Sequence, residues 1–229
     1  MPFQNDFFKS AFSVDNIIFG FDRDTLKVLL IKRASEPFSG QWALPGDLVR
    51  PDEDLDQAAF RILEELTGVK DVYLDQVHTF GEVNRHPRGR VITIAYYSLV
   101  NIKNVSIRAS SFADKVAWKE VRSISQLAFD HYEIMQTCLR RLRRDVKFQP
   151  IGFELLPEKF TLTELQRLYE SVLEKDLDKR NFRKKILSMN VLKSLDELQQ
   201  NVAHRPAMLY SFDADKYQLA KEQGFIFEL

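Results

Sequence analysis

The chain has 229 residues, enough for one large domain or two small ones that each bury a core. Its 33 basic and 33 acidic residues balance, which excludes a general attraction of the whole chain to nucleic acid or membranes. A hydrophobic content of 45% and 18 phenylalanines indicate a globular protein.

The single cysteine, Cys138, excludes an intramolecular disulfide and suits a reducing compartment. No apolar run approaches the roughly 18 residues of a membrane span. The N-terminus also lacks the basic-then-apolar pattern of a secretory signal peptide. We therefore expect a cytoplasmic protein with no membrane partner.

Strand and helix patterns alternate over the first two thirds of the chain. They predict strands at residues 14–21, 26–32, 71–83, 90–100 and 115–119, and helices at 54–67 and 131–144. The first two strands are expected to form a hairpin, and the turn-rich loop 37–46 precedes the first helix. His131 is expected to be a structural residue at the start of the second helix. This alternation predicts an α/β or α+β sandwich.

The helix at 54–67 shows one polar position on a face that is otherwise apolar. Residues 62, 65 and 66 fall at i, i+3 and i+4 and therefore share a helical face, which here presents Ile62, Glu65 and Leu66. A divalent cation needs several oxygen ligands at once, and one carboxylate does not supply them. The simpler interpretation is an amphipathic helix whose apolar stripe faces the core.

The order of strand, Gly-x-Trp-x-Leu-Pro-Gly loop (residues 40–46) and helix resembles the Nudix fold over residues 14–145. The Nudix box reads G-x5-E-x7-R-E-U-x-E-E-x-G-U, where U is a bulky aliphatic residue. This chain matches it at Glu53, Arg61, Leu63, Glu65, Gly68 and Val69. Asp47 replaces the box glycine, and Ile62 and Leu66 replace two glutamates. The resemblance implies a degenerate box with no catalytic residue, metal or cofactor; an active Nudix hydrolase of a nucleoside diphosphate derivative is the alternative.

The chain changes character at the Pro- and Gly-containing connector 148–152. Thr161 and Glu164 form a capping box that begins a helix, and Asp178 is a good N-cap for a second helix. Phe182, Ile186 and Met189 in that second helix have the spacing of core residues. Residues 204–212 are expected to be a strand entered through a basic tip. Helix, turn, basic helix and basic hairpin together predict a winged helix-turn-helix.

The second helix of this motif could bind DNA in the major groove. Five of the seven residues 179–185 are basic, although residues 160–229 hold 11 basic and 11 acidic residues, so the positive charge is local. Arginine and lysine bind phosphates or guanine, asparagine can pair with adenine, and a basic wing can reach the minor groove. The predicted DNA-binding residues are Lys179, Arg180, Asn181, Arg183, Lys184 and Arg205. A solvated, charged helix face, or a winged helix that binds protein, is the alternative.

The motifs Gly152-Phe-Glu-Leu-Leu-Pro157, Phe160-Thr-Leu-Thr-Glu164, Lys179-Arg-Asn-Phe-Arg183 and Arg205-Pro-Ala207 resemble the Nudix-related transcriptional regulators. That family joins a degenerate Nudix domain to a C-terminal winged helix. It includes repressors of NAD metabolism (NrtR type) and arabinose regulators for sugar utilisation (AraR type). The resemblance implies a homodimer formed by the Nudix domains, a palindromic double-stranded DNA operator and a small-molecule effector. Many members keep Gly-Gly where this chain has Gly46-Asp47.

The same resemblance divides the chain into an N-terminal arm (1–12), a Nudix-like sensing domain (13–148) and a winged helix domain (149–229). The effector is expected to be an ADP-ribose-like nucleotide or a sugar such as arabinose, and both stay open. Arginines could bind a diphosphate by charge-assisted hydrogen bonds, and glutamates could bind sugar hydroxyls. The predicted ligand-binding residues are Arg33, Arg50, Glu53, Glu65, Arg85, Arg88 and Arg90. For a single loop arginine, solubility is the alternative role.

Overall fold

The computed structural model describes residues 10–68, 72–107, 113–200, 202 and 205–229. Most of the predicted N-terminal arm (1–9), Val69 of the box and His204 of the predicted wing tip therefore lie outside the described residues. The chain divides into two compact units. Unit 1 comprises residues 1–20, 27–100 and 104–141, and unit 2 comprises residues 21–26, 101–103 and 142–229.

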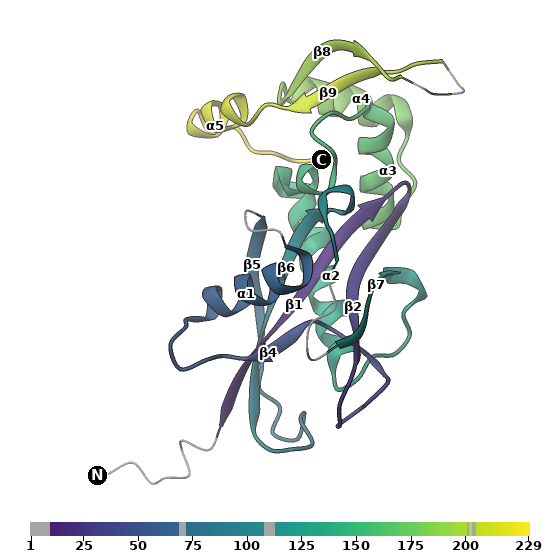
Figure 1. Ribbon diagram of the computed structural model, residues 1–229. Coiled ribbons are helices and arrows are strands. Elements are labelled where there is room, and N and C mark those ends of the chain that lie inside the picture. The colour runs from purple at the N-terminus through teal and green to yellow at the C-terminus, as the bar shows by residue number, and fades with distance from the viewer. Residues whose placement is uncertain (1–9, 69–71, 108–112, 201, 203–204) are drawn as a thin grey trace. The chain divides into compact units, whose positions relative to one another are not determined.

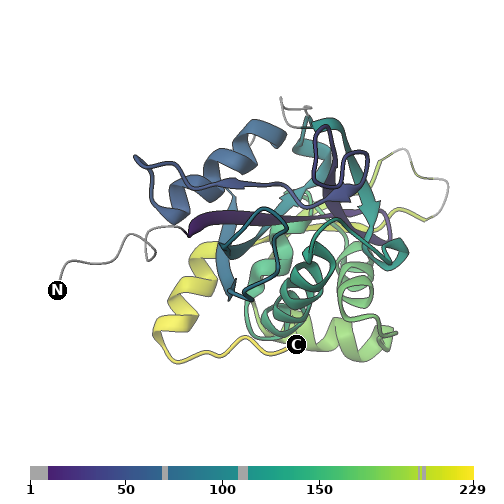
Figure 2. The same cartoon turned by 90° about the horizontal axis from the view of Figure 1, so that it is seen from below.

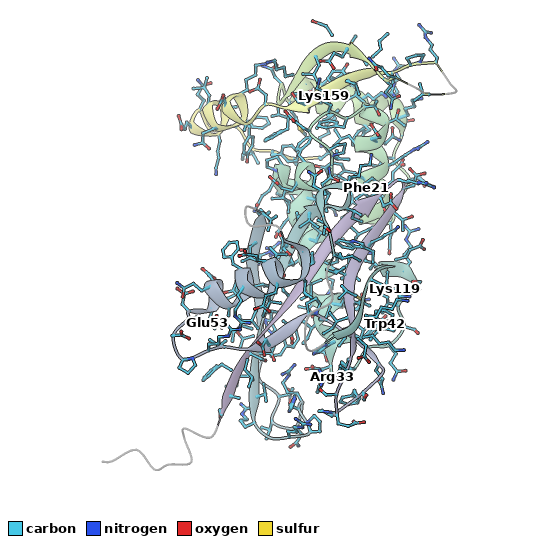
Figure 3. All side chains as sticks on the ribbon, viewed as in Figure 1. Phe21, Arg33, Trp42, Glu53, Lys119 and Lys159 are labelled. Carbon is cyan, nitrogen blue, oxygen red and sulfur yellow. The ribbon has the colours of Figure 1, made fainter. Side chains whose placement is uncertain are left out.

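A seven-stranded sheet forms the centre of the Nudix-like part of the chain (Figure 1). The strand order is β3-β2-β1-β6-β5, with β4 paired to β1 and β7 paired to β2. The strands are β1 (Ala11–Asp22), β2 (Thr25–Arg33), β3 (Trp42–Ala43), β4 (Gly46–Leu48), β5 (Tyr73–Phe80), β6 (Val91–Asn101) and β7 (Ala113–Glu120). Lys119 on β7 lies with its Nζ atom 4.8 Å from the ring centroid of Trp42 on β3, and the two side chains are adjacent in Figure 3.

Helices cover both faces of this sheet. Helix α1 (Leu55–Thr67) and the first part of α2 (His131–Phe148) lie on opposite sides, so the sheet is the middle layer of a sandwich (Figure 2). Between α1 and the sheet lies an apolar core that includes Ile18, Leu29 and Tyr96. This layering confirms the predicted mixed α+β sandwich.

Local sequence signals account for the ends of α1. The Asp54 side chain accepts a hydrogen bond from the backbone N–H of Gln57, and the Gln57 side chain accepts one from the backbone N–H of Asp54. These two bonds form a capping box at the first turn of the helix. Gly68 ends the helix at φ 69°, a left-handed conformation that glycine adopts without a steric penalty. Gln57 thus occupies the N3 position of the capping box, where Glu or Gln is usual.

Unit 2 contains the helices and hairpin of the predicted winged helix. Its elements after α2 are a 3-10 turn at Pro150–Leu155, α3 (Leu162–Leu173), α4 (Lys179–Ser188), β8 (Leu192–Leu198), β9 (Met208–Phe212) and α5 (Ala214–Glu222). The predicted capping box of α3 is present, because Thr161 and Glu164 exchange side-chain and amide hydrogen bonds. Phe160 pairs with Tyr210 through two backbone hydrogen bonds of 2.9 and 2.8 Å, which adds a short third strand to the hairpin.

Aromatic side chains build much of the core of unit 2. Phe153 stacks on Phe212 with ring centroids 4.6 Å apart, and Tyr169 of α3 contacts Phe182 of α4 at 5.9 Å. Phe182 and Ile186 are buried as predicted, while Met189 is half-buried. The spacing of apolar residues in α4 therefore identified its packed face correctly.

Two elements of unit 2 were not located from the sequence. The first strand of the predicted hairpin had no predicted bounds and is β8 at residues 192–198, and helix α5 at residues 214–222 was not predicted. Strand β8 is mostly exposed and its pairing shifts register between Ser194 and Leu198, so its alternation of buried and exposed residues is weak. Helix α5 has no fully buried residue, which explains why it shows no clear apolar stripe.

Candidate ligand pocket and nucleic-acid interface

Arg61 gathers the remaining acidic residues of the box around one guanidinium group. It binds Glu53 through two hydrogen bonds of 2.9 and 2.7 Å, and Asp47 through one of 3.0 Å. These bonds hold the pKa of Glu53 down to about 2 and raise that of Arg61. Asp47, which occupies the position of the box glycine, therefore forms an ion pair with Arg61 that a glycine could not form.

The helical face that would hold a metal in a working box is packed with apolar side chains instead. Ile62 and Leu66 are completely buried in the core between α1 and the sheet. The Glu65 carboxylate is already engaged, since its Oε1 atom lies 3.6 Å from Arg50 Nη2 and 3.7 Å from Arg61 Nη1. Within the described residues, three His, Cys, Asp or Glu side chains suited to one metal ion do not come together. These side chains do not fit the magnesium site of an active Nudix enzyme.

A cavity of about 530 Å³ opens in unit 1, within the size range of small-molecule sites. Its walls come from β1, β4, the end of β2, the loop before β6 and the start of α2. The polar residues that line it include Ser13, Asp15, Arg33, Asp47, Arg85, His86, Arg88, Arg90, Thr93 and His131. Apolar walls are supplied by Ile31, Leu44 and Phe129, among others.

Four of the predicted ligand-binding arginines line this cavity: Arg33, Arg85, Arg88 and Arg90. Three are held by main-chain carbonyl groups, since Arg33 donates to Pro37, Arg88 to Glu36 and Arg90 to Gly81. Each of these bonds uses one of the five N–H donors of a guanidinium group, so other donors remain for a ligand. A carbonyl oxygen carries no net charge and therefore does not neutralise the arginine. The cavity therefore presents positive charge that can bind a phosphate.

Arg85 differs from the other three because it is buried and paired. Its guanidinium forms two hydrogen bonds to Asp130, of 2.7 and 2.6 Å, and a third to the hydroxyl of Thr93. With 4% of its side chain exposed, Arg85 is a structural support of the pocket wall as well as a lining residue. The Arg85–Asp130 pair fixes the loop before β6 to the start of α2.

The remaining predicted ligand residues lie elsewhere. Arg50 and Glu53 line a separate cavity beside α1, together with Phe12 and Leu48, and Glu65 lies on α1 near Arg50. Figure 3 shows Glu53 well away from Arg33. The structure thus brings together the arginines of β2 and of the loop before β6 with Asp47 of the box, and it places Arg50, Glu53 and Glu65 outside that cavity.

Asp15 and His131 were not predicted as ligand residues, and both lie in the pocket wall. The Nδ1 atom of His131 accepts a hydrogen bond of 2.9 Å from the Leu44 amide, and burial lowers the pKa of His131 to about 3. The ring is therefore neutral, so its contact of 3.7 Å with Asp15 is not an ion pair. His131 has the structural role expected from the sequence. A polar residue that interrupts an apolar strand, as Asp15 does, was the signal available in the sequence.

Helix α4 carries the predicted DNA-binding residues. Phe182 and Ile186 bury one side of the helix, and Lys179, Arg180, Asn181, Lys184 and Lys185 are exposed. Asp178 caps the first turn by accepting a hydrogen bond of 2.8 Å from the Asn181 amide. The exposed face is positively charged and free of acidic side chains, as a helix that enters a DNA groove requires.

Arg183 is the one predicted DNA-binding residue in α4 that is half-buried. It donates a hydrogen bond of 3.0 Å to the hydroxyl of Thr163 at the start of α3. Its Nε atom is buried without a hydrogen-bond partner among the described residues. Arg183 therefore lies at the contact between α3 and α4. Arg205, next to the wing tip, is exposed.

A Nudix-type sandwich whose metal face is apolar, followed by a winged helix with a basic second helix, defines a two-domain transcriptional regulator. Comparison with family models agrees, since the NUDIX domain matches residues 9–142 and the NrtR DNA-binding winged helix domain matches residues 152–212. The chain therefore belongs to the NrtR family of Nudix-related transcriptional regulators, as the sequence motifs predicted.

Similar proteins cover both parts of the chain. An ADPR responsive transcriptional repressor, NtrR, of Acinetobacter baylyi is 35% identical over 93% of this chain and 86% of its own length. The crystal structure of Shewanella oneidensis NrtR with a 27mer DNA is 32% identical, covers 90% of this chain and 95% of that one, and superposes with a TM-score of 0.79. The NUDIX domain of the same Shewanella protein, crystallised with ADP ribose, is 34% identical over 62% of this chain and 94% of that one, with a TM-score of 0.54.

One further finding concerns membranes. Among the described residues, no helix has the length and apolar character required to cross a bilayer.

Proposed function

We propose that this protein is a transcriptional repressor that binds operator DNA through its winged helix and responds to ADP-ribose bound in the arginine-lined cavity of unit 1. The observation that carries the proposal is the joining of a basic α4 to a Nudix-type domain whose metal face is filled by Ile62 and Leu66. The A. baylyi relative, described as ADPR responsive, supports the choice of effector.

The cavity suits a diphosphate ligand better than a neutral sugar. Arg33, Arg88 and Arg90 supply guanidinium groups, which bind phosphate oxygens with short, charge-assisted hydrogen bonds. A sugar such as arabinose, the alternative effector, has no charge to neutralise these groups. The ADP ribose complex of the related Shewanella domain supports the same choice.

DNA binding in this proposal uses Lys179, Arg180, Asn181 and Lys184 of α4, and Arg205 of the wing. The DNA complex of the related Shewanella protein supports it. Arg183 has a positioning role, because its bond to Thr163 orients α4 against α3. We also infer a homodimer that binds a palindromic operator, which analytical ultracentrifugation of the free protein would test.

Fluorescence polarisation with the promoter DNA nearest the gene tests this function directly. We expect sequence-preferring binding that weakens with added salt, because the contacts are mainly to phosphates. ADP-ribose should change the DNA affinity at least tenfold, whereas arabinose should not. Failure to prefer any promoter sequence over random DNA would contradict the proposed function.

Hydrolysis is the competing function, and we infer that it is lost. The same ADP-ribose samples, incubated with Mg²⁺ and analysed by chromatography, distinguish the two. Robust, Mg²⁺-dependent turnover that Glu65→Gln abolishes would establish an active Nudix enzyme. Stable ADP-ribose that still alters DNA binding would support the sensor.

A further inference from the structure

Asp15 is a buried carboxylate without a hydrogen bond in the part of the chain that the structure describes. Its side chain is 7% exposed, and it lies at the wall of the 530 Å³ cavity. Its contacts with Arg85 and His131 lie beyond hydrogen-bond distance, with Arg85 Nη2 at 4.0 Å and His131 Nε2 at 3.7 Å from Asp15 Oδ2. A buried carboxylate that accepts no hydrogen bond raises the free energy of the fold, so a group that donates to Asp15 would gain that bond.

Packing holds the Asp15 carboxylate in place. Asp15 on β1 pairs with Gly46 on β4, and a side-chain carbon at Gly46 would lie only 2.0 Å from Asp15 Oδ1. The absence of a side chain at Gly46 therefore leaves room for the carboxylate. Arg85 directs its hydrogen bonds to Asp130 and Thr93, so its contact with Asp15 is the electrostatic one at 4.0 Å.

Arg85 and Asp47 in the cavity wall are paired with Asp130 and Arg61, and the other three arginines of the lining are more exposed than Asp15. Arg88 is exposed and Arg33 and Arg90 are half-buried, whereas Asp15 is 5% exposed. A phosphate is attracted to the three arginines and repelled by Asp15, so a diphosphate ligand is oriented with its uncharged end toward Asp15. Hydroxyl groups are the uncharged donors that a sugar beyond the diphosphate would place there.

We propose that Asp15 is a specificity-determining residue that accepts hydrogen bonds from the hydroxyl groups of the ligand's terminal sugar. This inference rests on the proposed function, since it assumes that the cavity binds an ADP-ribose-like molecule. Burial raises the pKa of Asp15 to about 7, against the lowering effect of Arg85, and Asp130 and His86 add smaller effects of opposite sign. A carboxyl group near its pKa can both accept and donate, as a hydroxyl partner does.

Isothermal titration calorimetry with three ligands tests the assignment in the full-length protein. ADP-ribose carries both the terminal ribose and the adenine amine, ADP lacks the terminal ribose, and inosine diphosphate ribose lacks the amine. For the unaltered protein we expect ADP-ribose to bind at least tenfold more tightly than ADP. In Asp15→Asn this preference should shrink to less than threefold, while the affinity for ADP changes little.

Asp52→Asn is the matched control, because Asp52 is an exposed aspartate outside the cavity lining, and it should keep the full preference. An Asp15→Asn protein that keeps the preference for ADP-ribose over ADP would overturn the inference. Loss of preference only for ADP-ribose over inosine diphosphate ribose would also overturn it, because Asp15 would then bind the adenine amine. If no ligand binds the unaltered protein, the proposed function fails instead. Circular dichroism of each variant verifies folding.

Discussion

Replacing Asp15 with asparagine should stabilise the folded protein at alkaline pH and not at acidic pH. Folding raises the pKa of Asp15 from its ordinary value of 3.8 to about 7. Below pH 3.8 the carboxyl group is neutral in both states, so it does not make stability pH-dependent. As the pH rises from 3.8 to 7, the unfolded chain releases this proton and the folded chain retains it, so folding becomes progressively less favourable. Above pH 7 the cost is constant.

The size of the effect follows from the shift. Each pKa unit corresponds to about 1.4 kcal/mol, so a shift of about three units costs about 4 kcal/mol at pH 8. The asparagine amide has two N–H donors where the neutral carboxyl group has one O–H, and one additional buried donor without a partner costs about 1–3 kcal/mol at every pH. We therefore expect Asp15→Asn to be about 1–3 kcal/mol more stable than the unaltered protein at pH 8. At pH 4 it should be less stable.

Urea denaturation at pH 4, 6 and 8, followed by circular dichroism, measures this difference. Other titrating groups are common to both proteins, so their contributions cancel. Asp52→Asn, at an exposed position outside the cavity lining, is measured alongside as the control for the removal of one carboxyl group. A free-energy difference between Asp15→Asn and the unaltered protein that is the same at all three pH values would refute the reasoning, because it would show that the carboxyl group titrates normally.

Three other predictions concern α4 and α1. Arg180→Ala and Lys184→Ala should each weaken DNA binding across sequences and reduce the slope of log K against log [salt] by about one, as measured by polarisation between low and high KCl. Arg61→Ala should destabilise the protein by about 1–3 kcal/mol near neutral pH. Folding lowers the pKa of Glu53 from 4.5 to about 2, so this group stabilises the fold above pH 4.5 and the gain is lost as the pH falls toward 2. The free energy of unfolding of Arg61→Ala, measured by urea denaturation, should therefore fall less between pH 4.5 and pH 2 than that of the unaltered protein. Leu66→Ala should cost about 2–5 kcal/mol by leaving a cavity in the core, and an unchanged unfolding midpoint would show that Leu66 is not packed as described.

Helical spacing puts residues 62, 65 and 66 on one side of α1, and the resemblance to the Nudix box implies that this side is a depleted metal face. The same local logic identified the capping box of α3 and the packed side of α4. The strands β1, β2 and β6 were predicted for the same reason, since long apolar runs bounded by turn residues are local features. The bounds of strand β8 and helix α5 were missed because their exposed residues show no strong periodicity.

The ligand pocket needed the tertiary structure. Seven residues were predicted to bind the ligand, and four of them line one cavity. These four are Arg33 at the end of β2 and Arg85, Arg88 and Arg90 in the loop before β6. Asp15 lies between Val14 and Asn16 on β1, and its pairing with Gly46 becomes visible only when β4 is placed beside it. Arg183 stays a predicted DNA-binding residue, and only the tertiary structure shows that it also donates a hydrogen bond to Thr163.

Local order along the chain thus determined the types of element, the degenerate box and the family. Which charges face one cavity, which are neutralised by a partner and which remain unpaired were decided by long-range strand pairing. The physical reason is that helical and strand periodicity act over a few residues, whereas burial and the pKa of a group depend on residues far away in the chain.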